Sequence, residues 1–551
     1  MTSRNLNKIF LSHSKNLIIL FFVGLAIVGY ILHADYGISL DEESTRFHGV
    51  VSLNYISDFL FPNQKFEFQM NESIPKLAQY THRGYGVFFE IFVVSIIEVI
   101  LKMKNFSEIF YARHLANHLL FIISLICFYF LVLNIFKSKL YAFFGSAILY
   151  TSPRIFAQSF YNDKDLVFLS FFIFLIFFSI KFIKKPSYYN AFLLALFSAM
   201  ACNVRIIGIY IIFLVAFFLI IQMLMENKFY LKKINILVVL IFFNFTFLYL
   251  LWPFLWEAPF DNIIYAIKTF SKYPWNANVF YLGDSYKSEF LPWHYFFIFF
   301  LATTSLLLSA IIICGIFQIV LRFIKRFINI DKNNSYKDIW RGKNEKIFLF
   351  ILVAIITPIF LILFLNSRIF NGWRHLYFLF PCLILIGIYF INRITLIYFR
   401  KKKTIIAIFI LGIICINNCY NLIKLHPYQY SYFNLIFEKN ANELFQIDYW
   451  GVSNKDALEN IVKSNLEKDK IIIGVASFTN LYLSKKMLPD KLRNKIIIAG
   501  QDYQNADFIF SNHIFEINPK FHNKYFIPKT FEKYKSLKKG NILINEFYKK
   551  R

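Results

Sequence analysis

The sequence predicts an all-α polytopic membrane protein of about 11 transmembrane helices, followed by a small α/β domain. Hydrophobic residues make up 58% of the 551 positions, and Phe alone accounts for 71. Apolar runs of roughly twenty residues recur through residues 1–420, which is the length a helix needs to cross the hydrocarbon of a bilayer. The remaining residues mix polar segments with short β-rich runs, which indicates a separately folded region.

The amino-terminal segment is predicted to be a membrane anchor. Residues 1–15, "MTSRNLNKIFLSHSK", are basic, and residues 17–33 are apolar without a clear small-x-small cleavage site. A retained anchor with these flanks starts on the cytoplasmic side of the membrane.

Residues 85–104, "YGVFFEIFVVSIIEVILKMK", decide the topology. At 100° per residue, the side chains of Glu90, Ser95, Glu98 and Lys102 fall within an arc of about 140°. Because two carboxylates inside one span are costly in lipid, this segment is predicted to lie in the membrane interface instead of crossing it.

Eleven spans then remain, and they place five basic segments on the cytoplasmic side, as the positive-inside rule requires. The expected spans are residues 17–33, 115–136, 139–152, 166–183, 189–202, 206–224, 234–252, 293–320, 347–366, 375–392 and 404–419. The basic segments are residues 137–139, 181–185, 228–233, 322–346 and 400–403.

Two domains are expected from this topology. Residues 1–420 form the transmembrane domain, and its long first outer loop, residues 34–114, carries interfacial helices. Residues 421–551 form an extracytoplasmic α/β domain, with strands expected in "KIIIGVASF" (470–478), "KIIIAG" (495–500) and "ADFIFSN" (506–512).

The placement of charge and the spacing of cysteines argue against a nucleic-acid partner and against a metal site built from Cys and His. The net charge is +27, but Lys and Arg lie largely in short blocks between apolar runs, which argues against a nucleic-acid partner. The six Cys residues lie in or beside apolar segments, and none is spaced with His as metal ligands are.

Polar residues gather where the expected spans reach the outer face. Three consecutive carboxylates follow the first span in "DYGISLDEEST" (35–45). The other polar residues at this level are Arg83, Arg113, Asn162, Asp163, Asp165, Arg205, Arg368, Arg374 and His375. Carboxylates and guanidinium groups are therefore expected to face one another in a single interfacial layer.

Each of these residues also has a purely structural interpretation. Ser39 and Glu42 fit a capping box, and Asp165 at the start of a helix suits the helix dipole. Arg205 can extend to lipid head groups, and Arg374 with His375 can anchor a span. The functional interpretation rests on the convergence of all of them on one side of the membrane.

Transfer of a group from a lipid-linked phosphate suits such a layer. A carboxylate at the interface can accept the proton of an attacking hydroxyl. Arg residues nearby can hold the departing phosphate through the bidentate fork of the guanidinium, while the lipid tail stays in the bilayer.

The order of these features resembles bacterial GT-C superfamily glycosyltransferases of the protein O-mannosyltransferase and aminoarabinose transferase type, which use polyprenyl-phosphate-linked sugars. The corresponding positions read "LDEE" (40–43), Arg83, Arg113, Asp165 and Arg205, and the match covers about residues 1–225. The family often carries Lys or His followed by prolines where this chain has "HRGYG" (82–86). The stretches "HPYQYSYFN" (426–434) and "IDYWGVSNKDALENI" (447–461) look like a tail of uncharacterised bacterial members and indicate no acceptor.

The resemblance implies a role for each position. Asp41 would be the catalytic base with Glu42 beside it, and Asp165 would orient the acceptor or the acidic pair. Arg83 and Arg205 would bind the phosphate of the sugar donor. From its place in the outer layer, Arg374 is expected to join them. The supporting positions are Asn162, Asp163, Arg113 and His375.

The resemblance thus implies an inverting hexosyl- or pentosyltransferase of the bacterial inner membrane that acts on its periplasmic side. Its partners are a polyprenyl-phosphate-linked sugar donor, membrane lipid, and an acceptor that is protein, lipid or glycan. No cofactor is indicated with certainty, and a divalent metal stays open because an acidic pair can bind one or act alone. The alternatives are a transporter or flippase of lipid-linked sugars, which tends to place its charges near the midplane, and a polysaccharide polymerase or ligase. A non-enzymatic assembly or sensor protein is a further alternative if the outer carboxyl-terminal region is the working part.

Overall fold

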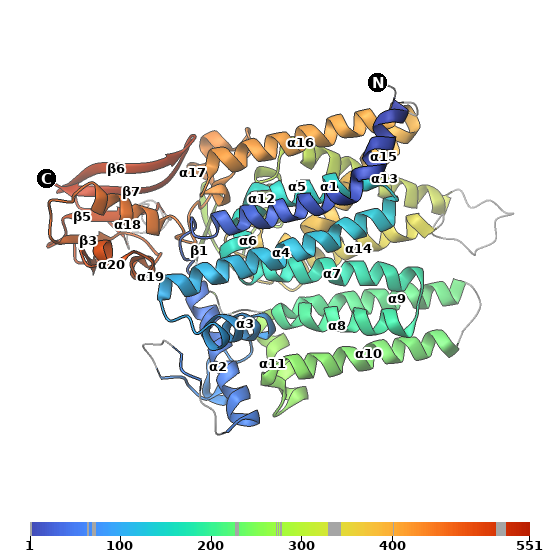
Figure 1. Cartoon of the computed structure of the whole chain (residues 1–551), viewed down its shortest axis with the longest axis horizontal. Coiled ribbons are helices and arrows are strands. Elements are labelled where there is room, and N and C mark those ends of the chain that lie inside the picture. The colour runs from blue at the N-terminus through green and yellow to red at the C-terminus, as the bar shows by residue number, and fades with distance from the viewer. Residues whose placement is uncertain are drawn as a thin grey trace.

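The computed structural model describes residues 3–62, 66–68, 73–225, 231–271, 273, 275, 278–328, 343–399, 402–513 and 525–551. A bundle of long helices carries a small sheet domain at one end (Figure 1). The predicted fold class, a helical membrane protein with a carboxyl-terminal α/β region, is confirmed. Parts of three predicted basic segments, 228–233, 322–346 and 400–403, lie outside the described residues.

Within those described ranges, nine helices have the length and composition of a membrane span. They are α1 (Ser3–Leu32), α4 (Phe106–Phe136), α7 (Asp165–Lys184), α9 (Tyr210–Met225) with the 3₁₀ turn Ile206–Ile209 before it, α10 (Leu231–Leu251), α13 (Leu306–Ile328), α14 (Lys343–Phe364), α15 (Phe380–Tyr398) with the 3₁₀ turn Arg374–Leu379 before it, and α16 (Lys403–Leu425).

The two other predicted spans are also helical but shorter. Helix α8 (Tyr188–Val204) has 17 residues. Helix α5 (Lys139–Thr151) has 13 residues, about 20 Å of rise, and is followed after Ser152 by α6 (Pro153–Tyr161). The predicted span 293–320 is divided into α12 (Tyr295–Ala302) and α13, because the helix breaks at Thr303–Ser305.

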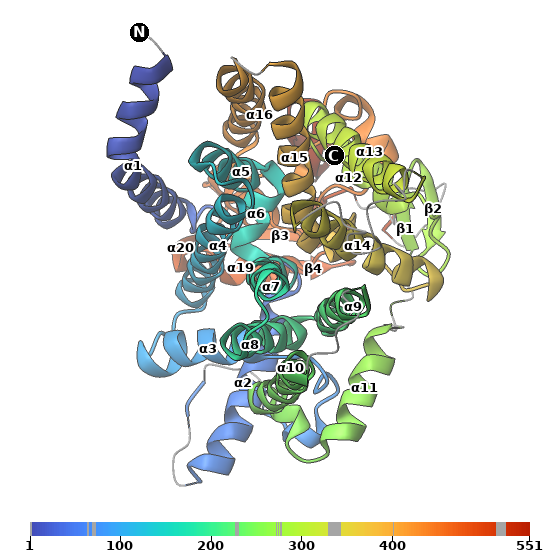
Figure 2. The ribbon, with the colours of Figure 1, turned by 90° about the vertical axis from the view of Figure 1, so that its right-hand side faces the viewer.

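Helix α7 occupies the middle of the bundle, as the end-on view shows (Figure 2). In the span that begins at Asp165, 78% of residues are buried within the protein, compared with 11% in the span of α1 at the periphery. A lipid-exposed helix can be apolar all round, whereas a central helix can carry a polar residue at its end if other helices supply partners. The first residue of α7 is therefore well placed for a polar cluster.

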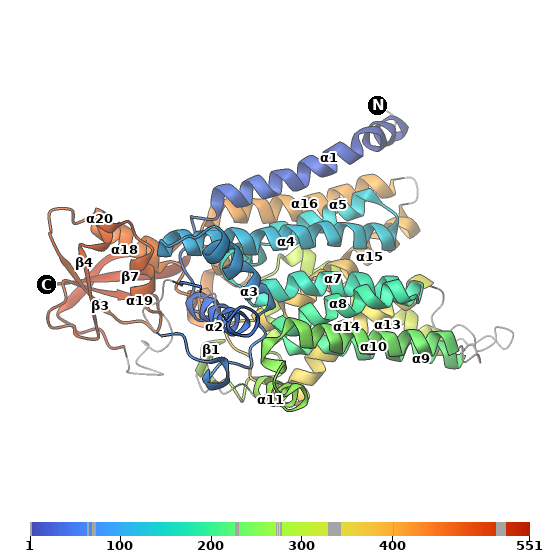
Figure 3. The same ribbon diagram turned by 60° about the horizontal axis from the view of Figure 1, so that its bottom comes forward.

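The first long loop folds back over the same end of the bundle as the sheet domain (Figure 3). It contains α2 (Glu42–Leu60) and α3 (Phe88–Val94), which continues into a π-helical turn, Ser95–Ile100. This helical stretch is shorter than a span, in agreement with the interfacial prediction for residues 85–104. The same end carries α11 (Pro259–Ser271) and the hairpin of β1 (Asn278–Tyr281) and β2 (Asp284–Lys287).

The carboxyl-terminal domain is built on a five-stranded sheet with the order β4-β3-β5-β7-β6. Strands β3 (Ile471–Val475), β4 (Ile496–Gly500) and β5 (Phe508–Ser511) are parallel and confirm the three predicted strands. The hairpin of β6 (Phe531–Lys539) and β7 (Ile542–Lys550) was not predicted, because its Lys-rich sequence lacks a continuous apolar run. The short helices are α17 (Ala441–Leu444), α18 (Asn454–Lys463), α19 (Leu481–Lys486) and α20 (Asp490–Arg493).

Candidate functional site

Asp165, the first residue of α7, is the centre of a buried ionic cluster at the end of the bundle that carries the sheet domain. Its carboxylate is fully buried and forms ion pairs with Arg205, which directly follows α8, and with Arg374, whose Nη1 lies 3.2 Å from Oδ2. Asn162 donates to the same Oδ2 at 3.2 Å and accepts from the Asp165 backbone N–H at 2.8 Å. Four of the predicted site residues are thus brought together from three separate parts of the chain.

Asp41 lies at the open edge of this cluster. Its Oδ2 is 3.5 Å from Nη1 of Arg374, and its side chain is 32% exposed. Although Asp41 precedes α2, its carboxylate makes no capping hydrogen bond, and only its backbone carbonyl accepts from Thr45. The carboxylate is therefore free to act on a molecule from outside.

Glu42 has a different environment and a structural role. Its fully buried carboxylate accepts the backbone N–H of Ser39 at 2.6 Å, which is one half of the predicted capping box. The other oxygen lies 2.9 Å from Nε2 of His114. Glu42 thus fixes the turn before α2, and its contacts within the described residues are with Ser39 and His114.

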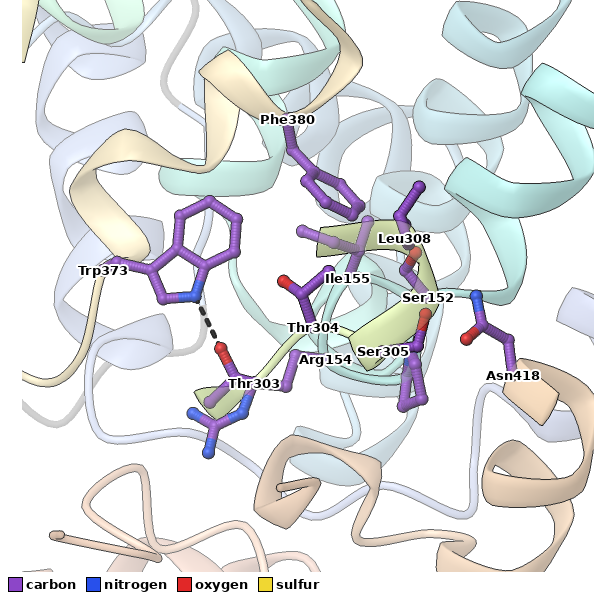
Figure 4. A pocket seen from close by; sticks show the side chains of 11 residues that line it. Ser152, Arg154, Ile155, Thr303, Thr304, Ser305, Leu308, Trp373, Phe380 and Asn418 are labelled. Carbon is purple, nitrogen blue, oxygen red and sulfur yellow. Dashed lines mark hydrogen bonds between the residues drawn. The ribbon is translucent and has the colours of Figure 1, made fainter. Parts of the chain in front are cut away.

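The Arg374 side chain packs among aromatic rings, and the turn that carries it is anchored by the neighbouring Trp373. Its guanidinium carbon lies 4.8 Å from the ring centre of Trp450, 5.1 Å from that of Phe370 and 5.4 Å from that of Tyr449. Such stacking is favourable for a guanidinium that is withdrawn from water. The neighbouring Trp373 donates its indole N–H to Thr303 at 2.8 Å, so the break between α12 and α13 anchors the Arg374 turn (Figure 4).

A small pocket beside this anchor contains Arg154, which sequence reasoning did not single out. The pocket is lined by Ser152, Pro153, Arg154, Ile155, Thr303, Thr304, Ser305, Leu308, Trp373, Phe380 and Asn418 (Figure 4). Arg154 donates from Nε to the carbonyl of Tyr432 at 3.0 Å, and its guanidinium lies 4.6 Å from the ring centre of Phe433. Arg154 forms no ion pair with a carboxylate among the described residues, and the groups that act on its guanidinium are the phenols of Tyr377, Tyr161 and Tyr449.

A second ionic cluster holds the supporting positions Arg113 and Asp163. Arg113 lies 2.6 Å from Glu90 and 3.2 Å from Asp163, and all three side chains are buried. Burial raises the pKa of Asp163 well above its usual range, and the neighbouring Glu90 raises it further. Burial also raises the pKa of Glu90. This cluster joins α3 and α4 to the turn before α7, which fixes the position of Asp165.

Glu98 likewise turns into the protein, where it lies 2.5 Å from Arg46. Both carboxylates of the amphipathic segment 85–104 are thus paired with Arg.

Arg83 is not brought to the Asp165 cluster. It donates to the carbonyl of Ala78, and its guanidinium lies 5.6 Å from the ring centre of Tyr265. Lys164, which sequence reasoning did not single out, lies next to Asp165 in the chain, with Nζ 4.6 Å from the ring centre of Tyr85. The His48 ring stacks on the same Tyr85 at 4.8 Å, and burial, assisted by Lys164, lowers the pKa of His48.

Several hydrogen-bonding atoms around Asp165 are buried without a hydrogen-bond partner in the described part of the chain. They are Nε of Arg205, Nε of Arg374, Nδ1 of His375 and the hydroxyl of Tyr449. Unpaired buried polar groups are costly, so their collection in one place suggests a ligand that bonds to them. The two guanidinium nitrogens and the phenol can all donate to an anion.

The described residues contain no group of three or more His, Cys, Asp or Glu side chains placed to hold a metal ion. The two carboxylates of the site, Asp41 and Asp165, each form an ion pair with the same guanidinium, that of Arg374.

Comparisons with known proteins give only distant likenesses. No protein-family model and no curated protein matches the chain. ArnT from Cupriavidus metallidurans bound to undecaprenyl phosphate is 11% identical, with a TM-score of 0.47 over 96% of this chain and 97% of ArnT. The oligosaccharyltransferase of Archaeoglobus fulgidus tethered with an acceptor peptide is 9% identical, with a TM-score of 0.43 over 89% of this chain and 69% of that chain. Because both TM-scores are below 0.5, neither likeness supports an argument about function.

Proposed function

We propose that this protein is an integral membrane glycosyltransferase of the GT-C type that uses a polyprenyl-phosphate-linked sugar. One observation supports this above the others: a partly exposed carboxylate, Asp41, lies beside a guanidinium, Arg374, that pairs with the buried Asp165. A proton acceptor next to a cationic group is the arrangement that sugar transfer from a phosphate requires.

In the proposed reaction, the acceptor hydroxyl gives its proton to the Asp41 carboxylate as its oxygen attacks the anomeric carbon. The bond between that carbon and the phosphate oxygen breaks, and its electron pair stays on the phosphate. Polyprenyl phosphate leaves with its additional negative charge next to Arg205 and Arg374, which stabilise it. A single displacement inverts the configuration at the anomeric carbon, and the acceptor is a protein, lipid or glycan on the periplasmic side of the inner membrane.

The buried Asp165 acts as a positioning residue in this scheme. Its carboxylate pairs with both Arg205 and Arg374, so it sets the separation of the two guanidinium groups. Asn162 fixes the carboxylate in turn. Arg83 lies against Tyr265, so we assign the phosphate to Arg205 and Arg374 and leave Arg83 outside the proposed contacts.

Reconstitution in vesicles tests the proposal against a flippase. Purified protein is placed in vesicles with a panel of polyprenyl-phosphate monosaccharides and a cell-envelope fraction as the acceptor source. We expect mass spectrometry to show free polyprenyl phosphate formed from at least one sugar donor, and no such product without protein. Movement of the intact lipid-linked sugar across the bilayer, with no cleavage of any member of the panel, would favour the transporter.

A further inference from the structure

The carboxyl-terminal stretch that begins "DYWGVSNK" (448–455) has no role in the scheme above, yet it lies directly on the site. The backbone N–H of Leu40 donates to the carbonyl of Trp450 at 3.1 Å, immediately before Asp41. Lys455 donates from Nζ to the carbonyl of Ala34 at 2.8 Å. The segment 448–455 therefore packs along the loop that carries the proposed base.

The loop that carries Asp41 and the segment 448–455 approach each other closely at Gly37 and Val452. A Cβ added to Gly37 would lie 2.4 Å from the carbonyl oxygen of Val452, well inside any real contact distance. The loop can approach the segment only because residue 37 has no side chain.

The carboxyl-terminal domain holds the segment in place. Asp448 accepts from Ser453 at 2.5 Å across the turn, in which Gly451 adopts a positive φ of 66°. Asn512, which follows β5, donates to the Asp448 carbonyl at 2.8 Å, and Asn545 of β7 donates to Ser453 at 2.7 Å. The position of the segment thus depends on the sheet being folded.

Tyr449 places an unused hydroxyl at the site. Its ring packs on the Arg374 guanidinium, while its hydroxyl is buried and has no hydrogen-bond partner among the described residues. The charges of Arg374, Asp41 and Asp165 all act on this hydroxyl. Burial raises the Tyr449 pKa well above its usual range, so the phenol keeps its proton and can donate a hydrogen bond to an anion.

We propose that the segment 448–455 is part of the site, and that the Tyr449 hydroxyl donates a hydrogen bond to a phosphate oxygen of the lipid-linked sugar donor, beside Arg205 and Arg374. This inference rests on the proposed function. If the segment is part of the site, the carboxyl-terminal domain contributes to donor binding. Donor binding then requires that this domain is folded.

Equilibrium binding of tritiated C55 polyprenyl phosphate to the full-length protein in nanodiscs tests the inference. We compare wild type with Tyr449→Phe, which removes only the hydroxyl, and with Tyr482→Phe, which removes a hydroxyl from a half-exposed ring of the same domain. Because a hydrogen bond to a charged group is lost, Tyr449→Phe should raise the Kd about tenfold or more at an unchanged melting temperature. The control should bind as wild type does.

The outcomes separate the two proposals. Failure of wild type to bind polyprenyl phosphate would remove the donor class and the proposed function with it. Binding by wild type with an unchanged Kd in Tyr449→Phe would overturn the inference alone. Millimolar inorganic phosphate should displace polyprenyl phosphate less effectively from Tyr449→Phe than from wild type. Equal displacement from both proteins would also overturn the inference, because the hydroxyl would then not contact phosphate. A second variant, Gly37→Ala, should weaken binding by separating the loop from the segment, and wild-type affinity in that variant would contradict the proposed contact.

Discussion

Replacement of Asp41 by Asn removes the proposed base with almost no change in shape. Within the described part of the chain, the carboxylate makes no capping hydrogen bond, and the one charged group it contacts is Arg374, at 3.5 Å. Asp41 is itself 32% exposed, and Arg374 keeps its ion pair with the buried Asp165 when the Asp41 charge is removed, so the folded protein should tolerate the change. General-base catalysis contributes about 100-fold to 10,000-fold, which at 1.36 kcal/mol for each factor of ten is about 2.7–5.4 kcal/mol in the barrier.

Single-turnover sugar transfer, polyprenyl phosphate binding and thermal unfolding should be measured on the same Asp41→Asn preparation. We expect transfer to fall by at least 100-fold, with the Kd and the melting temperature nearly unchanged. Glu43→Gln is the matched control, because Glu43 lies two residues after Asp41, in the first turn of α2, and is 40% exposed, 3.6 Å from Lys486. Transfer by Asp41→Asn at close to the wild-type rate would refute the mechanism while leaving the fold intact.

Three further predictions concern the cations, the topology and the carboxyl-terminal segment. Arg205→Gln and Arg374→Gln should each weaken donor use by about 1.5–3 kcal/mol, because each removes a charged hydrogen-bond donor; unchanged kcat/KM in both would assign these residues a structural role. Ser464→Cys, at an exposed position, should react with an impermeant maleimide in intact cells, and reaction only after lysis would refute the predicted topology. Burial raises the Asp448 pKa to about 7, whereas an Asp in the unfolded chain has a pKa of about 4. Between these two values the unfolded state loses its proton first, so the free energy of unfolding should fall as pH rises from about 4 to about 7. Asp448→Asn should therefore lose less melting temperature than wild type between pH 5 and pH 7, and equal losses would contradict this assignment.

Helix positions could be predicted because membrane insertion imposes a length and an apolar composition on each segment separately. Helices occupy the predicted spans, and residues 85–104 do not form one, since two carboxylates ruled out a lipid environment. The breaks were harder to predict. The three hydroxyl residues Thr303–Ser305 interrupt a stretch that has the length of a span, and neither Pro nor Gly marks the point.

The candidate site was partly predictable for a related reason. Asp165, Arg205 and Arg374 stand out as charges at the ends of apolar runs, so their common level in the membrane follows from the spans alone. Glu42 and Arg83 stand out equally, but Glu42 is buried against His114 and Arg83 lies on Tyr265. Sequence shows the level of a charge in the membrane and does not show which way its side chain turns.

The sequence by itself determined that this chain crosses a membrane many times, that its polar residues gather at one level, and that a sheet domain follows, because each of these depends on local composition. Only the tertiary structure decided which charges meet. Asp41 reaches Arg374 through a fold that joins residues more than three hundred positions apart, and Tyr449 reaches the same guanidinium from the carboxyl-terminal domain. Pairing at that separation is set by how helices pack, and packing depends on shape and charge over the whole bundle instead of on any one segment.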